Sequence, residues 1–173
     1  MLTLEKKQTV ADFSKIEEGN YCQLINGEIF ISPSTNHQRI SRDIFKLISK
    51  YLEQNIIGEV FYAPLDVYLD IENAYEPDIL YISKERKEII KEDGIHGAPD
   101  MIIEILSLSN SYHNTKTKMK VYEKYGVKEY WIVDPYDGEA IGYVNDVNKF
   151  KEFFHGTGEF TIQLLNLKIK FEF

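Results

Sequence analysis

"GAPDMIIEILS", which runs from Gly97 to Ser107, is the stretch of sequence that decides the fold. After Pro-Asp it becomes a short apolar run rich in isoleucine, which is typical of a strand buried on both faces of a sheet. One glutamate, Glu104, interrupts this run between Ile103 and Ile105. An ionised carboxylate without a partner is costly to bury, so we expect the fold to place a cation or a basic side chain beside Glu104.

A second carboxylate that shares a cation with Glu104 has to come from another strand. Asp100 lies on the same face of its strand as Glu104, but the two are roughly 13 Å apart and cannot bind one ion together. Asp78 opens a further apolar run in "EPDILYIS", residues 76–83. If the two strands are neighbours, about 4.8 Å apart, a suitable stagger brings Asp78 beside Glu104. Two carboxylates, waters and a backbone carbonyl near Ile105 would suit Mg²⁺ or Mn²⁺.

A basic partner for Glu104 is expected from the helix that follows its strand and ends at Gly126. Lys118 lies one turn before Tyr122 on the apolar side of this helix, so its side chain leans toward the sheet and can reach Glu104. Three other lysines recur at every fourth position and are interpreted as a solvated face: Lys116, Lys120 and Lys124.

A β-hairpin is predicted near the N-terminus, in "YCQLINGEIFIS", residues 21–32. Two short β-rich runs flank Asn26-Gly27, the dipeptide preferred in two-residue turns. This turn fixes the register of the hairpin and places Ile25 opposite Glu28.

A long helix is predicted over "HQRISRDIFKLISKYLEQN", residues 37–55, because its apolar residues recur with helical spacing. His37 falls on the same inward stripe, in the first turn. The apolar members of the stripe are Ile40, Ile44, Leu47, Ile48, Tyr51 and Leu52.

Further strands are predicted in "EVFYA", "LDVYLD" and "KEYWIVDP", followed by strands to the C-terminus that alternate with turns at "YDGE", "NDVNK" and "HGTGE". Helices and strands therefore interleave around a mixed central sheet, which defines an α/β (α+β) fold. With 173 residues, the chain is expected to form a single domain over residues 1–173. Residues 1–20 are expected to be an N-terminal tail with a short helix.

Composition excludes several classes of protein. A single cysteine, Cys22, rules out an internal disulfide, and one thiol with four histidines rules out thiolate-type zinc sites. No apolar run is long enough for a signal peptide or a membrane span, so a cytoplasmic protein without membrane contact is expected. The net charge of −8 argues against a protein that coats nucleic acid over its whole surface, while leaving room for a local basic surface.

Several motifs together resemble the Uma family of bacterial proteins, which is placed in the PD-(D/E)XK restriction-endonuclease-like superfamily. The similarity runs from about Tyr21 to Asp134 and is carried by "LINGE" with Glu28, "SPSTNH" with His37, "EPD", "GAPDMIIEILS", Lys118 four residues before Tyr122, and "YEKYGVKEYWIVDP".

The resemblance implies a restriction-endonuclease-like αβββαβ core, with the β-hairpin before it and a β-rich C-terminal extension after it. It implies that Asp78 and Glu104 are metal ligands and that Glu28 is a further acidic residue of the site. The sequence departs from the superfamily motif at Leu106, where a lysine is usual, and Lys118 is expected to take over from the helix. The activity implied is hydrolysis of DNA phosphodiester bonds by a water that Mg²⁺ or Mn²⁺ activates. A homodimer is expected, since cutting two strands favours a two-fold arrangement.

Structural interpretations of the same residues remain open. Glu104 and Lys118 could form a purely structural ion pair. Asp78 could serve turn chemistry at a strand entrance. Glu28 could be an exposed hairpin residue, and His37 could be a hydrogen-bonded residue of the helix start instead of part of the site. Two other aspartates, Asp66 and Asp134, and the core tryptophan, Trp131, are interpreted as structural.

Two other functions also remain open. The first is a nucleic-acid-binding or regulatory module that keeps the fold and does not cut. The second is a structural or protein-interaction domain in which Glu104 merely pairs with Lys118.

Overall fold

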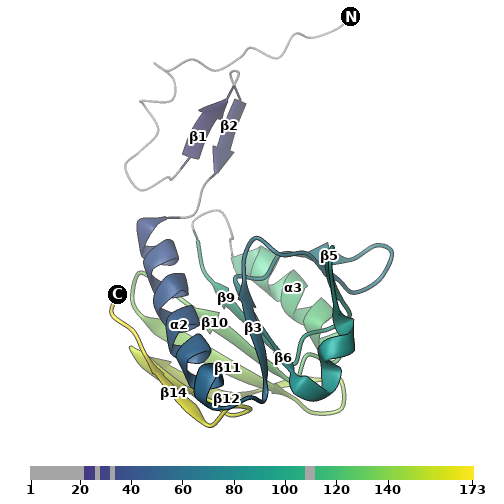
Figure 1. The fold of residues 1–173 in the computed structure, drawn as a ribbon. Coiled ribbons are helices and arrows are strands. Elements are labelled where there is room, and N and C mark those ends of the chain that lie inside the picture. The colour runs from purple at the N-terminus through teal and green to yellow at the C-terminus, as the bar shows by residue number, and fades with distance from the viewer. Residues whose placement is uncertain (1–21, 26–27, 32–33, 108–111) are drawn as a thin grey trace, which may run out of the picture.

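The computed structural model describes residues 22–25, 28–31, 34–107 and 112–173. Its core follows the predicted order of helix, three strands, helix and strand: α2 (Thr35–Gln54), β3 (Gly58–Tyr62), β6 (Ile79–Ser83), β9 (Met101–Ile105), α3 (Tyr112–Lys124) and β10 (Glu129–Val133). Figure 1 shows the two helices on either side of these strands. The predicted αβββαβ core is therefore confirmed.

The central sheet has six strands in the order β12-β11-β10-β9-β6-β3, where β11 is Glu139–Asn145 and β12 is Phe150–Thr157. β9 and β10 are parallel, because α3 crosses over between them, and the other neighbours are antiparallel. The sheet is mixed, as predicted. Every residue of β9 and β10 is buried, which explains why their sequences are almost wholly apolar.

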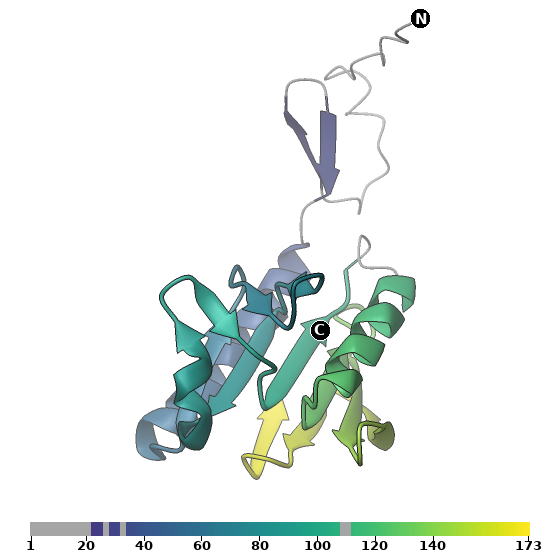
Figure 2. The ribbon, with the colours of Figure 1, turned by 90° about the vertical axis from the view of Figure 1, so that its right-hand side faces the viewer.

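Each face of the sheet packs against its own hydrophobic core. On one face, α2 presents Ile40, Ile44 and Ile48 to Ile103 and other residues of the sheet. On the other face, α3 contributes Tyr122, which packs with Ile102 and neighbouring residues. Figure 2 shows the sheet between the two helices. β9 therefore sends alternate side chains into two different cores.

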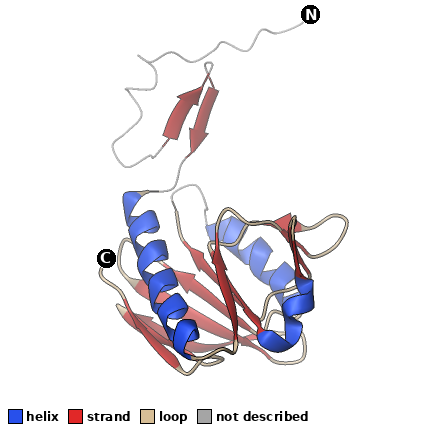
Figure 3. Cartoon of the chain, viewed as in Figure 1, coloured by secondary structure: helices blue, strands red, loops and turns tan. Residues whose placement is uncertain are grey.

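Two smaller sheets complete the structure. A four-stranded sheet in the order β5-β4-β8-β7 lies over the face that carries α3, and β13 pairs with β14 against the face that carries α2. Figure 3 shows these short strands around the larger sheet. Their bounds are β4 (Val67–Tyr68), β5 (Ala74–Tyr75), β7 (Ile90–Lys91), β8 (Gly94–His96), β13 (Glu159–Ile162) and β14 (Leu167–Lys170).

The N-terminal hairpin is formed by β1 (Cys22–Ile25) and β2 (Glu28–Ile31). Ile25 pairs with Glu28 and Cys22 with Ile31, which is the register that the sequence predicts. The hairpin is drawn beyond the N-terminal end of α2, away from the six-stranded sheet (Figure 1). The tail and short helix expected in residues 1–20, and the turn itself, lie outside the described residues.

Some local predictions were wrong. Leu47 was assigned to the buried stripe of α2 but is 37 % exposed, because its position lies just outside the arc that faces the sheet. Only Val67–Tyr68 of "LDVYLD" is a strand, since this segment joins the small sheet.

The charged residues after β6 form a 3₁₀ helix, Lys84–Ile89. Within the described residues, no helix is both long and apolar enough to span a membrane.

Candidate active site

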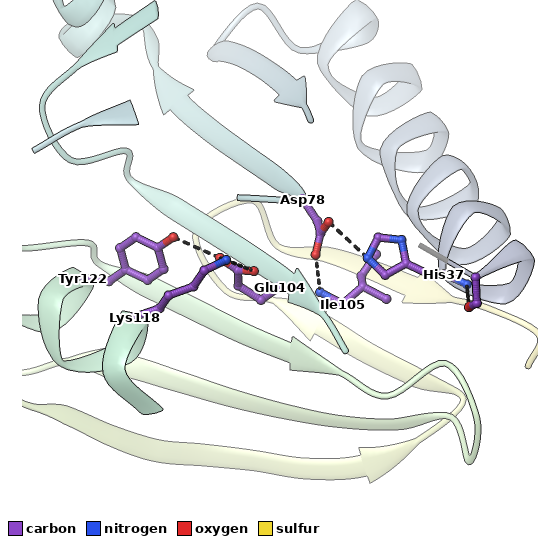
Figure 4. A network of polar contacts seen from close by, with 7 residues as sticks. His37, Asp78, Glu104, Ile105, Lys118 and Tyr122 are labelled. Carbon is purple, nitrogen blue, oxygen red and sulfur yellow. Dashed lines mark hydrogen bonds and ion pairs between the residues drawn. The ribbon is translucent and has the colours of Figure 1, made fainter. Parts of the chain in front are cut away.

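Strand register brings Asp78 and Glu104 to the same end of the sheet. β6 and β9 are antiparallel neighbours, and Ile79 pairs with Ile103. Continuing this register by one residue sets Asp78 across from Glu104. The stagger that the sequence left open is therefore the one that places the two acidic residues side by side (Figure 4).

Asp78 directly precedes β6, and its carboxylate accepts a backbone hydrogen bond from the neighbouring strand β9. The backbone N–H of Ile105 donates to Asp78 Oδ2 at 2.8 Å, a position that a backbone carbonyl would occupy in a longer ladder. The other oxygen, Oδ1, lies 3.1 Å from His37 Nε2. Asp78 is thus fixed in one orientation by a strand and a helix.

His37 reaches Asp78 from the first turn of α2. Ser34 caps this helix, and its hydroxyl accepts the backbone N–H of His37 at 3.0 Å. The imidazole is buried, and its proton on Nε2 is directed at Asp78, since a carboxylate can only accept. The other nitrogen, Nδ1, is buried and has no hydrogen-bond partner among the described residues.

Glu104 is held from the opposite face of the sheet by α3. Lys118 Nζ donates to both carboxylate oxygens, at 2.9 and 2.8 Å, and the hydroxyl of Tyr122 donates to Oε1 at 2.9 Å. The side chain points out of β9 toward this helix (Figure 4). Lys118 contacts Glu104 from the helix, as the helical spacing predicts. The lysines interpreted as a solvated face are exposed: Lys116, Lys120 and Lys124.

Burial dominates the electrostatics of this carboxylate. Glu104 is 3 % exposed, and its pKa is raised from 4.5 to about 7, chiefly by burial. The negative charge of Asp78 contributes to this rise, and the ammonium group of Lys118 opposes it. Asp78 and Glu104 lie across from each other on neighbouring strands, and a cation shared by their carboxylates would relieve the repulsion between the two negative charges.

The donors fit a small divalent cation held by few protein ligands. Mg²⁺ is usually bound through one or two carboxylates and retains several waters, and Asp78 with Glu104 provides that set. Both oxygens of Asp78 and Oε2 of Glu104 have a second lone pair beyond the one used by the partner described above, whereas Oε1 of Glu104 accepts from both Lys118 and Tyr122. No group of three or more His, Cys, Asp or Glu side chains is gathered for a metal among the described residues, so a cage built only of protein ligands is absent there.

Other predicted residues lie apart from this pair or outside the description. Glu28 opens β2, but its side chain is among those not described, so its place in the site stays a prediction. Asp66 accepts a hydrogen bond from Tyr68 at 3.1 Å, and Asp134 accepts the N–H of Tyr136 at 2.8 Å. Both aspartates therefore have local partners, which agrees with their structural interpretation.

Sequence reasoning used Tyr122 only to orient the helix and missed its contact with Glu104. The available signal was the spacing of one helical turn between Lys118 and Tyr122, which puts both side chains on the same side of α3. It also missed Tyr130 on β10, whose hydroxyl is buried and has no hydrogen-bond partner among the described residues. The ring of Tyr130 lies 5.6 Å from that of Tyr122, centroid to centroid, in the same core, and burial followed by the charge of Glu104 raises the pKa of Tyr130.

Two matches to known proteins bear on the family and the fold of this chain. The sequence model of the Uma2 family, described as "Putative restriction endonuclease", matches residues 10–168. A crystal structure described as "a putative nuclease belonging to DUF820" from Anabaena variabilis superposes with a TM-score of 0.66 at 21 % identity, covering 94 % of each chain. No match was found among the curated proteins. The solved structure confirms the restriction-endonuclease-like fold, and the family match confirms the resemblance seen in the sequence.

Proposed function

Because this chain belongs to the Uma2 family of putative restriction endonucleases, we propose that it hydrolyses phosphodiester bonds of DNA with the help of Mg²⁺ or Mn²⁺. One observation carries the proposal: Asp78 and Glu104 meet at one end of two neighbouring strands, and Lys118 contacts Glu104 there. Such a set of two carboxylates and one amine matches what metal-assisted phosphodiester hydrolysis needs.

Asp78 and Glu104 would hold the divalent ion. When bound, such an ion supplies a Lewis acid that lowers the pKa of water and offsets negative charge on the phosphate. The residues around the carboxylates fix their geometry in advance. His37 and the Ile105 N–H orient Asp78, and Tyr122 orients Glu104.

Lys118 supplies the positive charge of the protein itself. In the structure its ammonium group neutralises Glu104 in a buried setting, where charges interact strongly. The same group is only partly covered, so it can pair with a phosphate oxygen or orient the attacking water. This is the role that a lysine two residues after Glu104 would have, transferred to α3.

Nicking of a supercoiled plasmid tests this function. Wild type and Glu104→Gln are incubated in parallel with Mg²⁺, Mn²⁺ or EDTA. We expect nicking by the wild type only with a divalent ion, and a loss of at least about 100-fold in Glu104→Gln, because the variant cannot supply a charged ligand. Metal-dependent nicking that survives in Glu104→Gln would reject the proposed role of Glu104.

Glu129→Gln is the matched control. Glu129 lies on the adjacent strand β10 and is 2 % exposed, but it binds Trp131 and the backbone N–H groups of Gln163 and Leu164. This variant removes a buried carboxylate of the same kind outside the site. We expect it to keep its nicking activity at temperatures where circular dichroism shows it folded.

A second function is favoured by one feature of the geometry. Both oxygens of Glu104 accept hydrogen bonds from Lys118, as they would in a purely structural ion pair. A nucleic-acid-binding module that does not cut would account for this arrangement. Tight DNA binding in EDTA, with no cleavage in any divalent ion, would support the module over the nuclease.

A further inference from the structure

A groove with basic and aromatic walls runs along the outer side of α2 and the end of β3. Its volume is about 620 Å³, and its lining includes Arg39, Arg42, Phe45, Lys46 and Tyr62. The chain as a whole carries a net charge of −8, so a concentration of three basic residues in one groove is a local exception. The two elements that form the groove stand side by side in Figure 1.

The basic residues of the groove are exposed and lie within two turns of one helix. Arg39, Arg42 and Lys46 all face solvent. Asp43 takes one hydrogen bond from Arg42 Nε at 2.7 Å and offsets one of the three charges. The groove therefore keeps a positive balance, which fits a ligand that carries several negative charges along its length, such as a phosphate backbone.

An aromatic pair gives the groove a second kind of recognition. Tyr62 is 57 % exposed although it is large, and its ring lies 4.5 Å from that of Phe45, centroid to centroid. An exposed ring supported from below by another ring is a platform on which an unpaired base can stack. The bases of a duplex are stacked on each other, so they cannot use such a platform. The combination of arginines and an exposed tyrosine favours a single strand.

The groove adjoins the candidate active site through both of its walls. Tyr62 pairs with Ile79, and the N–H of Ala63 donates to the backbone carbonyl of Asp78 at 3.0 Å. In α2, His37 contacts the carboxylate of Asp78, and its neighbour Gln38 lines the groove. A nucleic-acid strand bound in the groove would therefore extend toward the end of the sheet that carries Asp78 and Glu104.

We propose that this groove binds a single-stranded segment of nucleic acid, with Arg39, Arg42 and Lys46 on its phosphates and Tyr62 stacked on a base. The class of ligand rests on the proposed function. The placement of the nucleic-acid strand in this groove rests on the charge, exposure and position of the residues that line it.

Binding is measured by fluorescence anisotropy in EDTA, so that no cleavage interferes. The probes are a fluorescein-labelled thymidine 20-mer and the same strand paired with its complement, each over a series of salt concentrations. The groove variant combines Arg39→Gln, Arg42→Gln and Lys46→Gln. The control variant combines Lys87→Gln, Lys120→Gln and Lys149→Gln, three exposed lysines elsewhere, and changes the net charge equally.

The groove variant should bind the single strand at least about tenfold more weakly than wild type. Its plot of log affinity against log salt should lose a slope of about 2, which is the value for three phosphate contacts on a single strand. The control variant should bind as the wild type does. Equal weakening in both variants, or none in the groove variant, would overturn the proposal.

Tyr62 tests the stacking directly. Tyr62→Ala should weaken binding of the thymidine 20-mer about tenfold, and Tyr62→Phe should retain it, since the ring is sufficient for stacking. On a strand of equal charge whose residues lack bases, wild type and Tyr62→Ala should bind alike. Duplex binding as tight as single-strand binding, or no binding of either probe by the wild type, would contradict the placement of a single strand here.

The outcome for the groove is separable from the outcome for catalysis. Loss of binding in the groove variant, in a protein that cuts nothing with any metal, would support the groove and reject the nuclease. Metal-dependent cutting that is unchanged in the groove variant would retain the nuclease and reject the groove.

Discussion

Glu104 receives hydrogen bonds from Lys118 and Tyr122 on a strand whose other residues are all apolar. A buried ion pair adds little net stability, because the desolvation of both groups offsets their attraction. A variant of the protein with an apolar side chain at this position would therefore be expected to be at least as stable. The presence of a carboxylate here favours a chemical role over a stabilising one.

The stability of the protein should depend on pH through Glu104. Its pKa is raised from 4.5 to about 7 on folding, so its contribution to stability is complete below pH 4.5 and is lost as the pH rises through about 7. Relative to Glu104→Gln, the wild type should lose on the order of 3 kcal/mol of unfolding free energy between these limits. Urea denaturation of both proteins in EDTA at about pH 5 and about pH 8 measures this change. A constant difference between them would show that Glu104 stays ionised throughout.

Lys118 should be the lysine of α3 whose loss destabilises the fold. Lys118→Met leaves Glu104 buried without its cation and should lower the unfolding free energy by about 3 kcal/mol at about pH 8. The loss should shrink at about pH 5, where Glu104 is protonated. Lys120→Met, on the exposed side of the same helix, should change stability by less than about 0.5 kcal/mol. Equal effects of the two variants in urea denaturation would argue against the ion pair.

At the scale of elements, α2 has a narrow buried arc that carries both the packing and one wall of the site. Its buried residues recur at every third or fourth position, and His37 begins the series. Packing of the isoleucines on the sheet fixes the rotation of the helix, and this rotation directs His37 at Asp78. The opposite side of the helix is then free to form the basic groove.

The boundary of that arc can be tested by mutation. Ile44 is fully buried, so Ile44→Ala should lower the unfolding free energy by about 2–5 kcal/mol through lost burial and the cavity it leaves. Leu47→Ala should cost less than about 1 kcal/mol, because Leu47 already contacts solvent. Chemical denaturation of both variants measures the difference. A large loss for Leu47→Ala would mean that something further covers this side chain.

At the scale of the whole molecule, the site exists only where two strands and two helices converge. Asp78 comes from the start of β6, Glu104 from β9, His37 from α2 and Lys118 from α3. A cation bound between the two carboxylates would link these elements. Metal binding should therefore stabilise the entire fold.

Thermal unfolding with Mn²⁺ tests this linkage. At about 100 times its Kd, an ion that binds only the folded chain adds about 2.7 kcal/mol, which should raise the Tm of the wild type by roughly 5–10 °C. Asp78→Asn and Glu104→Gln should each abolish most of this rise, while Glu129→Gln should retain it. The same rise in all three variants would place the ion elsewhere.

The pairing of two copies remains a prediction that follows from double-strand cleavage. A homodimer should have twice the 20.2 kDa mass of the chain by light scattering after gel filtration. A monomer that nicks single strands would fit the groove and remove the argument for the dimer.

The sequence by itself determined the order of the core elements, the hairpin register and, apart from Leu47, the residues of α2 that face inward. These features follow from local rules, such as the preference of the dipeptide Asn-Gly for two-residue turns and the periodic spacing of apolar residues in helices. Even the contact of Lys118 with Glu104 was accessible, because a short helix returns over the strand that precedes it.

The tertiary structure alone decided how distant residues meet. The stagger of β6 against β9 lets Asp78 accept the N–H of Ile105, 27 residues away, and the rotation of α2 places His37 on the same carboxylate. Such contacts depend on the packing of whole elements, which a local pattern does not specify. The groove between α2 and β3 also depends on tertiary packing, since its basic residues on the helix and Tyr62 on the strand become neighbours only when α2 packs on the sheet.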